Sequence, residues 1–350
     1  MRIATYNVEW FDNLFDNDGA LLNDGQWSGR QDVTRSEQIA ALSYVFQRLD
    51  ADAILVVEAP DSSRRRNGNV ALEAFAAHAS IRARKALVGF KNDTQQELML
   101  LFDPDILDAI HDPIGEETGK KGARIAPRFD GTYRIDLDID ATEDLVRFSK
   151  PPLEALIDSA EGSFRLIGVH AKSKAPHGAR NRDEMMRLAI ANRRKQLAQC
   201  IWLRDRVDHH LDMGDPLIVA GDFNDGPGLD EFERLFGRSG LEIVLGTDLE
   251  AQDQLFDPHA DQALMSRFGV QPTTARFYIR DEDRYLTALL DYIMVSPVLR
   301  PFSRNWRIWH PFEDPACWRD ETLRRALLVA SDHFPVTMEL NGPFPSPVTG

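Results

Sequence analysis

Two stretches of this chain, LIVAGDFND at residues 217–225 and LVASDHFPV at residues 328–336, are the most informative about its fold. Each starts with an apolar run typical of a buried strand and then turns polar, at Asp222 and Asn224 in the first and at Asp332 and His333 in the second. A charged group at the end of a buried strand is costly unless it is paired or binds a metal. We therefore predict that these side chains take part in chemistry.

Four other apolar runs carry polar groups of the same kinds. They are RIATYNVEWF with Asn7 and Glu9, ADAILVVE with Glu58, FRLIGVH with His170, and LLDYIMVS with Asp291. Asn7 and Glu9 are two residues apart on one predicted strand, so their side chains point to the same face. Because all these groups are carboxylates, amides or imidazoles, we predict that they form the floor of one hydrolytic metal site.

The periodicity of the chain indicates the α/β class. Strands are expected at residues 2–8, 53–58, 97–102, 164–169, 217–221, 289–295 and 327–330. One helix begins with the capping-box pair Thr34 and Glu37 and runs to Leu49, and others cover residues 69–79, 184–213 and 229–236. No linker divides the chain, so we predict a single domain over residues 1–340 and a mobile, proline-rich tail over residues 341–350.

The composition is that of a soluble globular protein, with 43% hydrophobic and 28% charged residues. No apolar run approaches the ~18 residues of a membrane span. The N-terminus shows no signal pattern, so we expect a cytoplasmic protein without a transmembrane segment. Cys200 and Cys317 are too few for a disulfide framework or a thiolate metal site.

The net charge of -15 counts against a broad nucleic-acid-binding face. Basic residues are nevertheless concentrated shortly after two of the predicted site residues, Glu58 and His170. Five of them are predicted to contact a phosphate-bearing substrate: Arg64, Arg65, Lys172, Lys174 and Arg180. Charge runs are often only solvated surface, and both interpretations stay open at this point.

The chain from Met1 to about Leu340 resembles the endonuclease/exonuclease/phosphatase superfamily, which includes deoxyribonuclease I, abasic-site endonucleases, inositol polyphosphate 5-phosphatases and sphingomyelinases. The resemblance runs through TYNVEWF, VVEAP, GVHAKS, GDFND, LDYIMVS and SDHFP, of which GDFN and SDHFP are the most specific. It implies a four-layer α/β sandwich, in which two packed mixed sheets are flanked by helices. One departure is Val57, which stands where the family usually has Gln before its metal-binding Glu.

The resemblance also implies a metal site. Glu58, Asn7, Glu9 and Asp332 match the residues that hold the metal or lie beside it in the family. The expected ion is Mg²⁺, with Mn²⁺ as a substitute, because Mg²⁺ binds through one or two carboxylates and keeps several waters.

The remaining site residues match catalytic groups of the family. Asp222 corresponds to the residue that orients or deprotonates the attacking water, and Asn224 to a donor to a phosphate oxygen. His333 and Asp291 correspond to a His–Asp pair in which the carboxylate favours the imidazolium. His170 corresponds to a histidine that deoxyribonuclease I and many phosphatases carry where abasic-site endonucleases carry Tyr. It is expected to protonate the leaving oxygen, and the sequence does not name its carboxylate partner.

The expected function is magnesium-dependent hydrolysis of phosphodiester bonds by in-line attack of water, with a nuclease as the leading hypothesis and nucleic acid as the expected partner. A phosphomonoesterase or a lipid phosphodiesterase, of the inositol phosphate or sphingomyelin type, would share the catalytic set and stays open. His170 counts against an abasic-site endonuclease. A catalytically silent binding scaffold is disfavoured, because every acid, amide and imidazole position is filled. The sequence indicates no protein partner.

Overall fold

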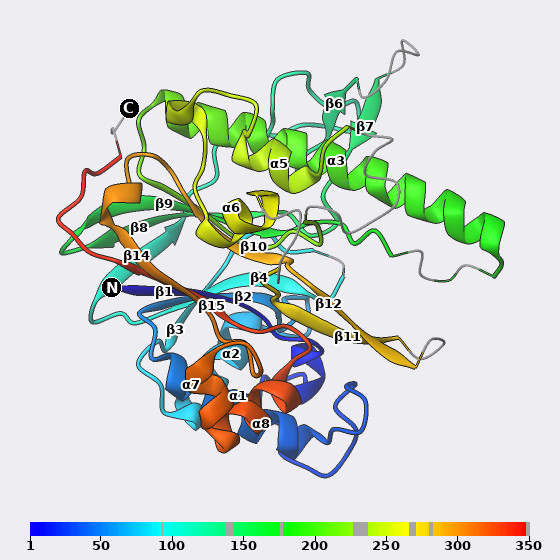
Figure 1. Ribbon diagram of the computed structural model, residues 1–350, viewed down its shortest axis with the longest axis vertical. Helices are drawn as coiled ribbons and strands as arrows, with labels where there is room; N and C mark the ends of the chain where they lie inside the picture. Colours follow the sequence, from blue (N-terminus) through cyan, green and yellow to red (C-terminus); the bar gives the residue numbers. More distant parts are fainter. Residues whose placement is uncertain are drawn as a thin grey trace.

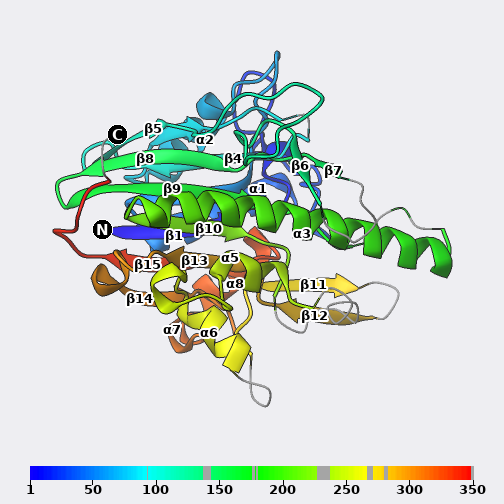
Figure 2. The same ribbon diagram turned by 90° about the horizontal axis from the view of Figure 1, so that it is seen from above.

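The structure is a computed structural model that describes residues 1–92, 94–136, 143–175, 178, 180–226, 237–265, 271–279 and 283–347. Two β-sheets lie face to face at its centre, and helices cover the outer face of each sheet (Figures 1 and 2). The predicted four-layer α/β sandwich is confirmed.

The first sheet carries Asn7 and Glu58. Its strands are β1 (Arg2–Asn7), β2 (Ala53–Ala59), β3 (Lys85–Val88), β4 (Glu97–Phe102), β14 (Ser303–Ile308) and β15 (Val336–Leu340). They follow the order β14-β15-β1-β2-β4-β3. β1 and β2 run parallel, with Asn7 opposite Val57, so both strands end at the same edge of the sheet.

The second sheet carries His170, Asp222 and Asp291. Its strands are β5 (Leu107–His111), β8 (Leu153–Ser159), β9 (Gly162–His170), β10 (Leu217–Asp222) and β13 (Asp291–Val295). They follow the order β13-β10-β9-β8-β5. β9 and β10 run parallel, with Asp222 opposite His170, and Asp222 also lies opposite Asp291 on the antiparallel strand β13.

The helices form two outer layers (Figure 1). The first sheet is covered by α1 (Arg35–Leu49), α2 (Gly68–Ala79), α7 (Pro315–Arg319) and α8 (Glu321–Ala330). The second is covered by α3 (Arg182–Asp212), α5 (Gly240–Leu245) and α6 (Pro258–Met265). None of the helices in the described part of the chain is long and apolar enough to cross a membrane.

Shorter elements connect these layers. In the described part of the chain, two hairpins lie outside the two main sheets: β6 (Tyr133–Ile135) with β7 (Asp144–Val146), and β11 (Ala275–Ile279) with β12 (Arg284–Ala288). The short 3-10 helices are η1 (Phe11–Leu14), η2 (Ala251–Asp253) and η4 (Arg300–Phe302). The β11–β12 hairpin and the N-terminal part of α3 both extend beyond the sheets on the same side (Figures 1 and 2).

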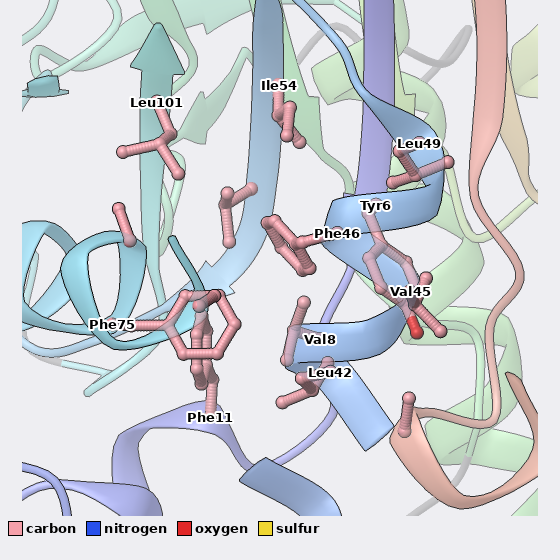
Figure 3. Close-up of a cluster of buried hydrophobic side chains, with 14 of the residues drawn as sticks. Tyr6, Val8, Phe11, Leu42, Val45, Phe46, Leu49, Ile54, Phe75 and Leu101 are labelled. Carbon is pink, nitrogen blue, oxygen red and sulfur yellow. The ribbon is translucent and has the colours of Figure 1, made fainter. Parts of the chain in front are cut away.

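The core has a layer between the sheets and a layer under each set of helices. Figure 3 shows the layer beneath α1 and α2, where the Phe75 ring lies 5.1 Å from both Phe11 and Phe46. Burying a side chain of this size contributes about 1.5–3 kcal/mol. The layer between the sheets includes Ile3 near the N-terminus and Phe344 near the C-terminus. This shared core supports a single domain over residues 1–340, which stays a prediction.

Three of the predicted helices are confirmed. Helix α1 starts at Arg35 after a capping box in which Thr34 and Glu37 satisfy each other's backbone N–H groups. Helix α2 covers residues 68–79. Helix α3 covers residues 182–212 and ends just before Gly214, which has a left-handed φ of 71°. The helix predicted over residues 229–236 falls outside the described residues.

The strand predicted at residues 327–330 is wrong, because these residues form the last turn of α8. The Asp320 side chain accepts a hydrogen bond from the Leu323 backbone and starts the helix there. Leu323, Leu327 and Ala330 are then buried at helical spacing. Asp332 and His333 consequently lie on the loop between α8 and β15.

The start of the predicted mobile tail is packed against the body of the protein. Phe344 is buried beside Phe164 and Phe302, and its backbone N–H donates to Glu161 O at 3.0 Å. Residues 341–347 are therefore part of the fold, and residues 348–350 lie outside the described part of the chain.

Candidate active site

The polar ends of the central strands meet in one cavity of about 800 Å³. Eight of the predicted catalytic and metal-binding residues line it: Asn7, Glu9, Glu58, His170, Asp222, Asn224, Asp332 and His333. Asp291 is buried next to it, with its Oδ2 2.7 Å from His333 Nδ1. The cavity forms because β1–β2 of one sheet and β9–β10 of the other end at neighbouring edges of the sandwich.

The backbone at three site positions adopts left-handed conformations. Glu58 has a φ of 59° at a register shift in the β2–β4 pairing, and Asn224 has a φ of 49°. Such conformations are uncommon for these residue types and cluster at functional sites. Gly221 has a φ of 130°, and a Cβ there would lie 2.0 Å from the Val169 carbonyl oxygen. Only glycine at position 221 therefore allows β10 to place Asp222 in the cavity.

Asp222 is the buried carboxylate at the centre of the site. Its Oδ2 accepts hydrogen bonds from Asn7 Nδ2 at 3.0 Å and Asn224 Nδ2 at 3.1 Å. Its Oδ1 accepts one from the Asn224 backbone N–H at 2.7 Å. Burial raises the pKa of Asp222 to about 7, although the His333 charge and these hydrogen bonds oppose the shift. A carboxylate with a pKa near neutrality can accept a proton from water.

The Asn224 amide is already engaged in this structure. Besides Asp222, it donates to the Ala171 carbonyl oxygen at 3.2 Å. Asn224 therefore orients Asp222, and its predicted donation to a phosphate oxygen stays a prediction.

His333 and Asp291 form the predicted pair. Burial by itself would lower the pKa of the His333 imidazole, but the charge and hydrogen bond of Asp291 raise it to about 10. His333 is therefore an imidazolium at neutral pH. It places a fixed positive charge opposite Asp222 in a site where a phosphate would bring negative charge.

His170 has a neighbour that the sequence did not reveal. The Nζ of Lys150 lies 3.2 Å from both ring nitrogens of His170, whereas Glu58 and Asp222 are 3.9 Å and 3.7 Å from its Nε2. Burial and then the Lys150 charge hold the pKa of His170 well below its ordinary value of 6.5. The expected role of His170 as the proton donor to the leaving oxygen stays a prediction, and it requires the imidazole to gain a proton against burial and the Lys150 charge.

Glu9 and Asp332 lie at one side of the cavity. Glu9 is in the turn after β1, where it forms an ion pair with Arg30 and accepts a hydrogen bond from the Trp10 indole at 3.0 Å. If Glu9 lies beside a metal, as predicted, its carboxylate would have to contact both the metal and Arg30. Asp332 lines the same side of the cavity, next to His333.

The oxygen donors of the site fit a divalent cation. Asn7 Oδ1 is buried without a hydrogen-bond partner in the described part of the chain. Burial also raises the pKa of Glu58, against the opposing charges of Lys150 and His333, and a bound cation would favour its ionised form. Ligand atoms of Asp222, Asp291 and His333 lie within 4.8 Å of one another. That trio suits proton handling better than metal binding, because His333 is protonated.

A model of the Endonuclease/Exonuclease/phosphatase family matches residues 4–333 of the chain. The chain belongs to this family. It is accordingly a hydrolase of phosphoesters. Among curated proteins, none matches the chain by sequence.

Several solved structures share the fold at low sequence identity. Humanized D. rerio TDP2 with 14 mutations is 12% identical, with a TM-score of 0.51 over 97% of this chain and 98% of that chain. The 3′-5′ exonuclease NExo from Neisseria meningitidis is 14% identical, with a TM-score of 0.50 over 97% and 100%. An AP endonuclease from Archaeoglobus fulgidus is 11% identical, with a TM-score of 0.52 over 97% and 99%. At these identities the likeness shows the fold alone.

The five predicted substrate-binding residues differ in whether they line the cavity. Lys172 lines the cavity. Lys174 Nζ instead lies 2.5 Å from the fully buried carboxylate of Asp225. Arg64, Arg65 and Arg180 are exposed and are not among the residues that line the cavity.

The loop after β2 explains the position of Arg64 and Arg65. Arg66 is ion-paired with Asp12 and donates to the Phe15 carbonyl oxygen at 3.2 Å, so the loop is tied to η1. Contact of its exposed arginines with a longer substrate stays a prediction.

Two side chains that contact predicted site residues gave no signal in the sequence. Lys150 precedes two prolines and the strand β8, outside any of the family motifs. Arg30 lies in an irregular segment and reaches Glu9 only through the tertiary fold. Neither position follows an apolar run, which was the pattern that identified the other residues.

Proposed function

We propose that this protein hydrolyses phosphodiester bonds of nucleic acids with the help of Mg²⁺. The observation that carries the proposal is the arrangement around Asp222. A buried carboxylate held by Asn7 and Asn224 lies in the same cavity as the imidazolium of His333 and the ammonium of Lys150. Asp222 can accept a proton from water, and the cations of His333 and Lys150 can bind the phosphate oxygens.

The division of labour follows from these charges. Asp222 orients the attacking water and takes its proton, because its Oδ2 is fixed by two amides and its pKa lies near 7. His333, kept protonated by Asp291, donates to a non-bridging phosphate oxygen. Lys150 and neutral His170 supply hydrogen bonds on the opposite side.

A divalent cation would be held by Glu58 and Asn7, and Asp332 lines the same cavity. When bound, such an ion neutralises charge that develops on the phosphoryl oxygens and on the leaving oxygen. Mg²⁺ is preferred because the donors are hard oxygens and the cavity has room for bound water.

A nuclease is preferred among the phosphoesterases. The family is named for endonucleases and exonucleases, and solved structures of the same fold include an exonuclease and an AP endonuclease. The β11–β12 hairpin contributes Phe277, Ile279 and Leu286 to the lining of the cavity, which gives it an apolar wall. Such a wall can accommodate the base or sugar next to a scissile phosphate.

The test is a substrate panel assayed with Mg²⁺, with Mn²⁺ and with excess chelator. It should contain linear and supercoiled DNA, RNA, bis(p-nitrophenyl) phosphate, p-nitrophenyl phosphate, an inositol polyphosphate and sphingomyelin. We expect hydrolysis of DNA or RNA and of the chromogenic diester, lost in chelator and in His333→Ala. His209→Ala, which removes an exposed histidine at the far end of α3, is the matched control.

Two results would reject the proposal. Full activity in excess chelator would rule out the role of a metal. Turnover of a monoester, inositol phosphate or sphingomyelin without turnover of any nucleic acid would assign the site to another branch of the family.

A further inference from the structure

A row of exposed aromatic rings and arginines runs from the β11–β12 hairpin to helices α7 and α8. Its rings are between 38% and 51% exposed, and none of its members belongs to the catalytic set described above. We call it the aromatic–arginine row, and its members are Tyr278, Tyr285, Arg276, Phe312, Trp318 and Arg324.

Each member of the row contacts the next. The rings of Tyr278 and Tyr285 are 5.2 Å apart, and the Arg276 guanidinium lies 3.3 Å from the centre of the Tyr285 ring. The same guanidinium is 5.4 Å from the ring of Phe312, so it bridges the hairpin and the segment before α7.

The row then continues onto the helices. Phe312 is 6.2 Å from Trp318, and Arg324 lies 4.6 Å from the Trp318 ring. Arg324 also donates to the Trp318 carbonyl oxygen at 2.6 Å, which fixes its position over the indole. Single exposed apolar residues are common on proteins, but a contiguous set of this kind marks an interaction surface.

The row begins at the active site. Arg276, Tyr278 and Tyr285 line a second cavity of about 490 Å³ on the outer face of the hairpin. This cavity shares Glu9, Phe277 and Asp332 with the catalytic cavity. A chain that leaves the catalytic cavity past Asp332 would therefore meet the row directly.

The charge along the row indicates that it binds the flat rings of a ligand rather than its phosphate groups. Acidic side chains accompany the two arginines: Tyr278 donates to Asp283 at 2.7 Å, and Glu313 follows Phe312 in sequence. Two of the six members of the row are cationic, fewer than the roughly four to eight basic residues that typically bind an anionic membrane surface. Aromatic rings alternating with guanidinium groups are instead the surface on which unpaired bases stack.

We propose that the aromatic–arginine row binds the unpaired bases of a single-stranded nucleic acid that extends from the active site. This proposal rests on the proposed nuclease function and makes its substrate more specific: a strand with several unpaired nucleotides on the Asp332 side of the scissile phosphate. A double helix would keep its bases stacked on each other and could not use the row.

The test compares leucine and phenylalanine substitutions in the full-length protein. Fluorescence anisotropy of a labelled ten-nucleotide oligothymidylate is measured in chelator, so that no turnover occurs. Tyr285→Leu and Trp318→Leu keep apolar bulk but remove the ring, and each should weaken binding by roughly 5- to 100-fold. Tyr285→Phe and Trp318→Phe keep the ring and should bind within about threefold of the unmodified protein.

Two controls separate this surface from the catalytic site. Ile110→Ala, at an exposed position on the edge strand β5 of the second sheet, should bind as the unmodified protein does. The kcat on bis(p-nitrophenyl) phosphate with Mg²⁺ should stay unchanged in all these variants, because that substrate is too short to reach the row.

The outcomes are distinguishable. Equal oligonucleotide binding by the leucine variants would overturn the proposal, as would binding to phosphatidylcholine or phosphatidylserine vesicles without binding to the oligonucleotide. Failure to hydrolyse any diester with Mg²⁺ would instead reject the proposed function, whatever the binding assay shows.

Discussion

Replacing Asp291 with Asn removes the charge that keeps His333 protonated and preserves the shape of the side chain. Asp291 is 2% exposed, and its Oδ2 lies 2.7 Å from His333 Nδ1. The pKa of His333 is raised from 6.5 to about 10. At about 1.4 kcal/mol per pKa unit, the surroundings favour the imidazolium by on the order of 5 kcal/mol.

The variant should lose most of this preference. Burial opposes the charged form while the remaining Asp222 and Asp332 charges favour it, so the pKa of His333 in Asp291→Asn should fall from about 10 toward its ordinary value of 6.5. If the pKa reaches 6.5, the kcat for a phosphodiester should drop by roughly fourfold at pH 7 and by roughly 10²-fold or more at pH 9, because the imidazolium fraction falls by these factors. An imidazolium is lost as pH rises through its pKa, so the alkaline limb of the kcat profile should move from near pH 10 toward neutral pH.

The assay is a pH profile of kcat, accompanied by a thermal melt of each variant. Asp215→Asn is the matched control, because Asp215 is also a buried carboxylate 2.8 Å from a histidine, His210, but outside the cavity. It should leave the pH profile unchanged. If folded Asp291→Asn kept nearly normal kcat at neutral pH with the alkaline limb in place, the reasoning about the His333 charge would be refuted.

Three further perturbations test other parts of the site. Lys150→Gln should raise KM for a phosphodiester by roughly tenfold or more, since the half-buried ammonium contacts His170 inside the cavity, and Lys150→Arg should recover much of the loss. Equal KM values for both variants and the unmodified protein would contradict this. Glu58→Gln should weaken Mg²⁺ binding, measured by calorimetry, by roughly tenfold or more. In chelator and above pH 7 this variant should melt at the same or a higher temperature than the unmodified protein, because burial already disfavours the ionised carboxylate. A variant that is much less stable in chelator would show that Glu58 is structural. Gly221→Ala should lower the free energy of unfolding in urea by about 2–4 kcal/mol, because its Cβ would meet Val169 O at 2.0 Å; unchanged stability would mean that β9 and β10 can separate at this point.

The residues that the sequence identified share a local signature. Asp222 and Glu58 each lie at the end of an apolar strand. A short stretch of sequence therefore shows both the apolar run that predicts a buried strand and the polar residue at its end. Helix α1 was predictable for the same reason, because its capping box and its apolar spacing are both local. The strand expected at residues 327–330 failed because a short apolar run fits either a strand or the last turn of a helix.

What stayed hidden depends on contacts between distant parts of the chain. Lys150 meets His170 because β8 and β9 pair in one sheet, and Arg30 reaches Glu9 across a loop without periodicity. The protonation states follow from these contacts: the neutral state of His170 depends on burial and Lys150, not on its neighbours in sequence.

The sequence by itself therefore determined the fold class, the family and the set of polar groups that form the floor of the site. The tertiary structure alone decided which groups carry charge and which substrate contacts are available. Asn7 and Asp222 are 215 positions apart and are joined by a hydrogen bond of 3.0 Å only because the two sheets stack. The aromatic–arginine row is likewise assembled from a hairpin and two helices, whose side chains meet through packing rather than through any pattern along the chain.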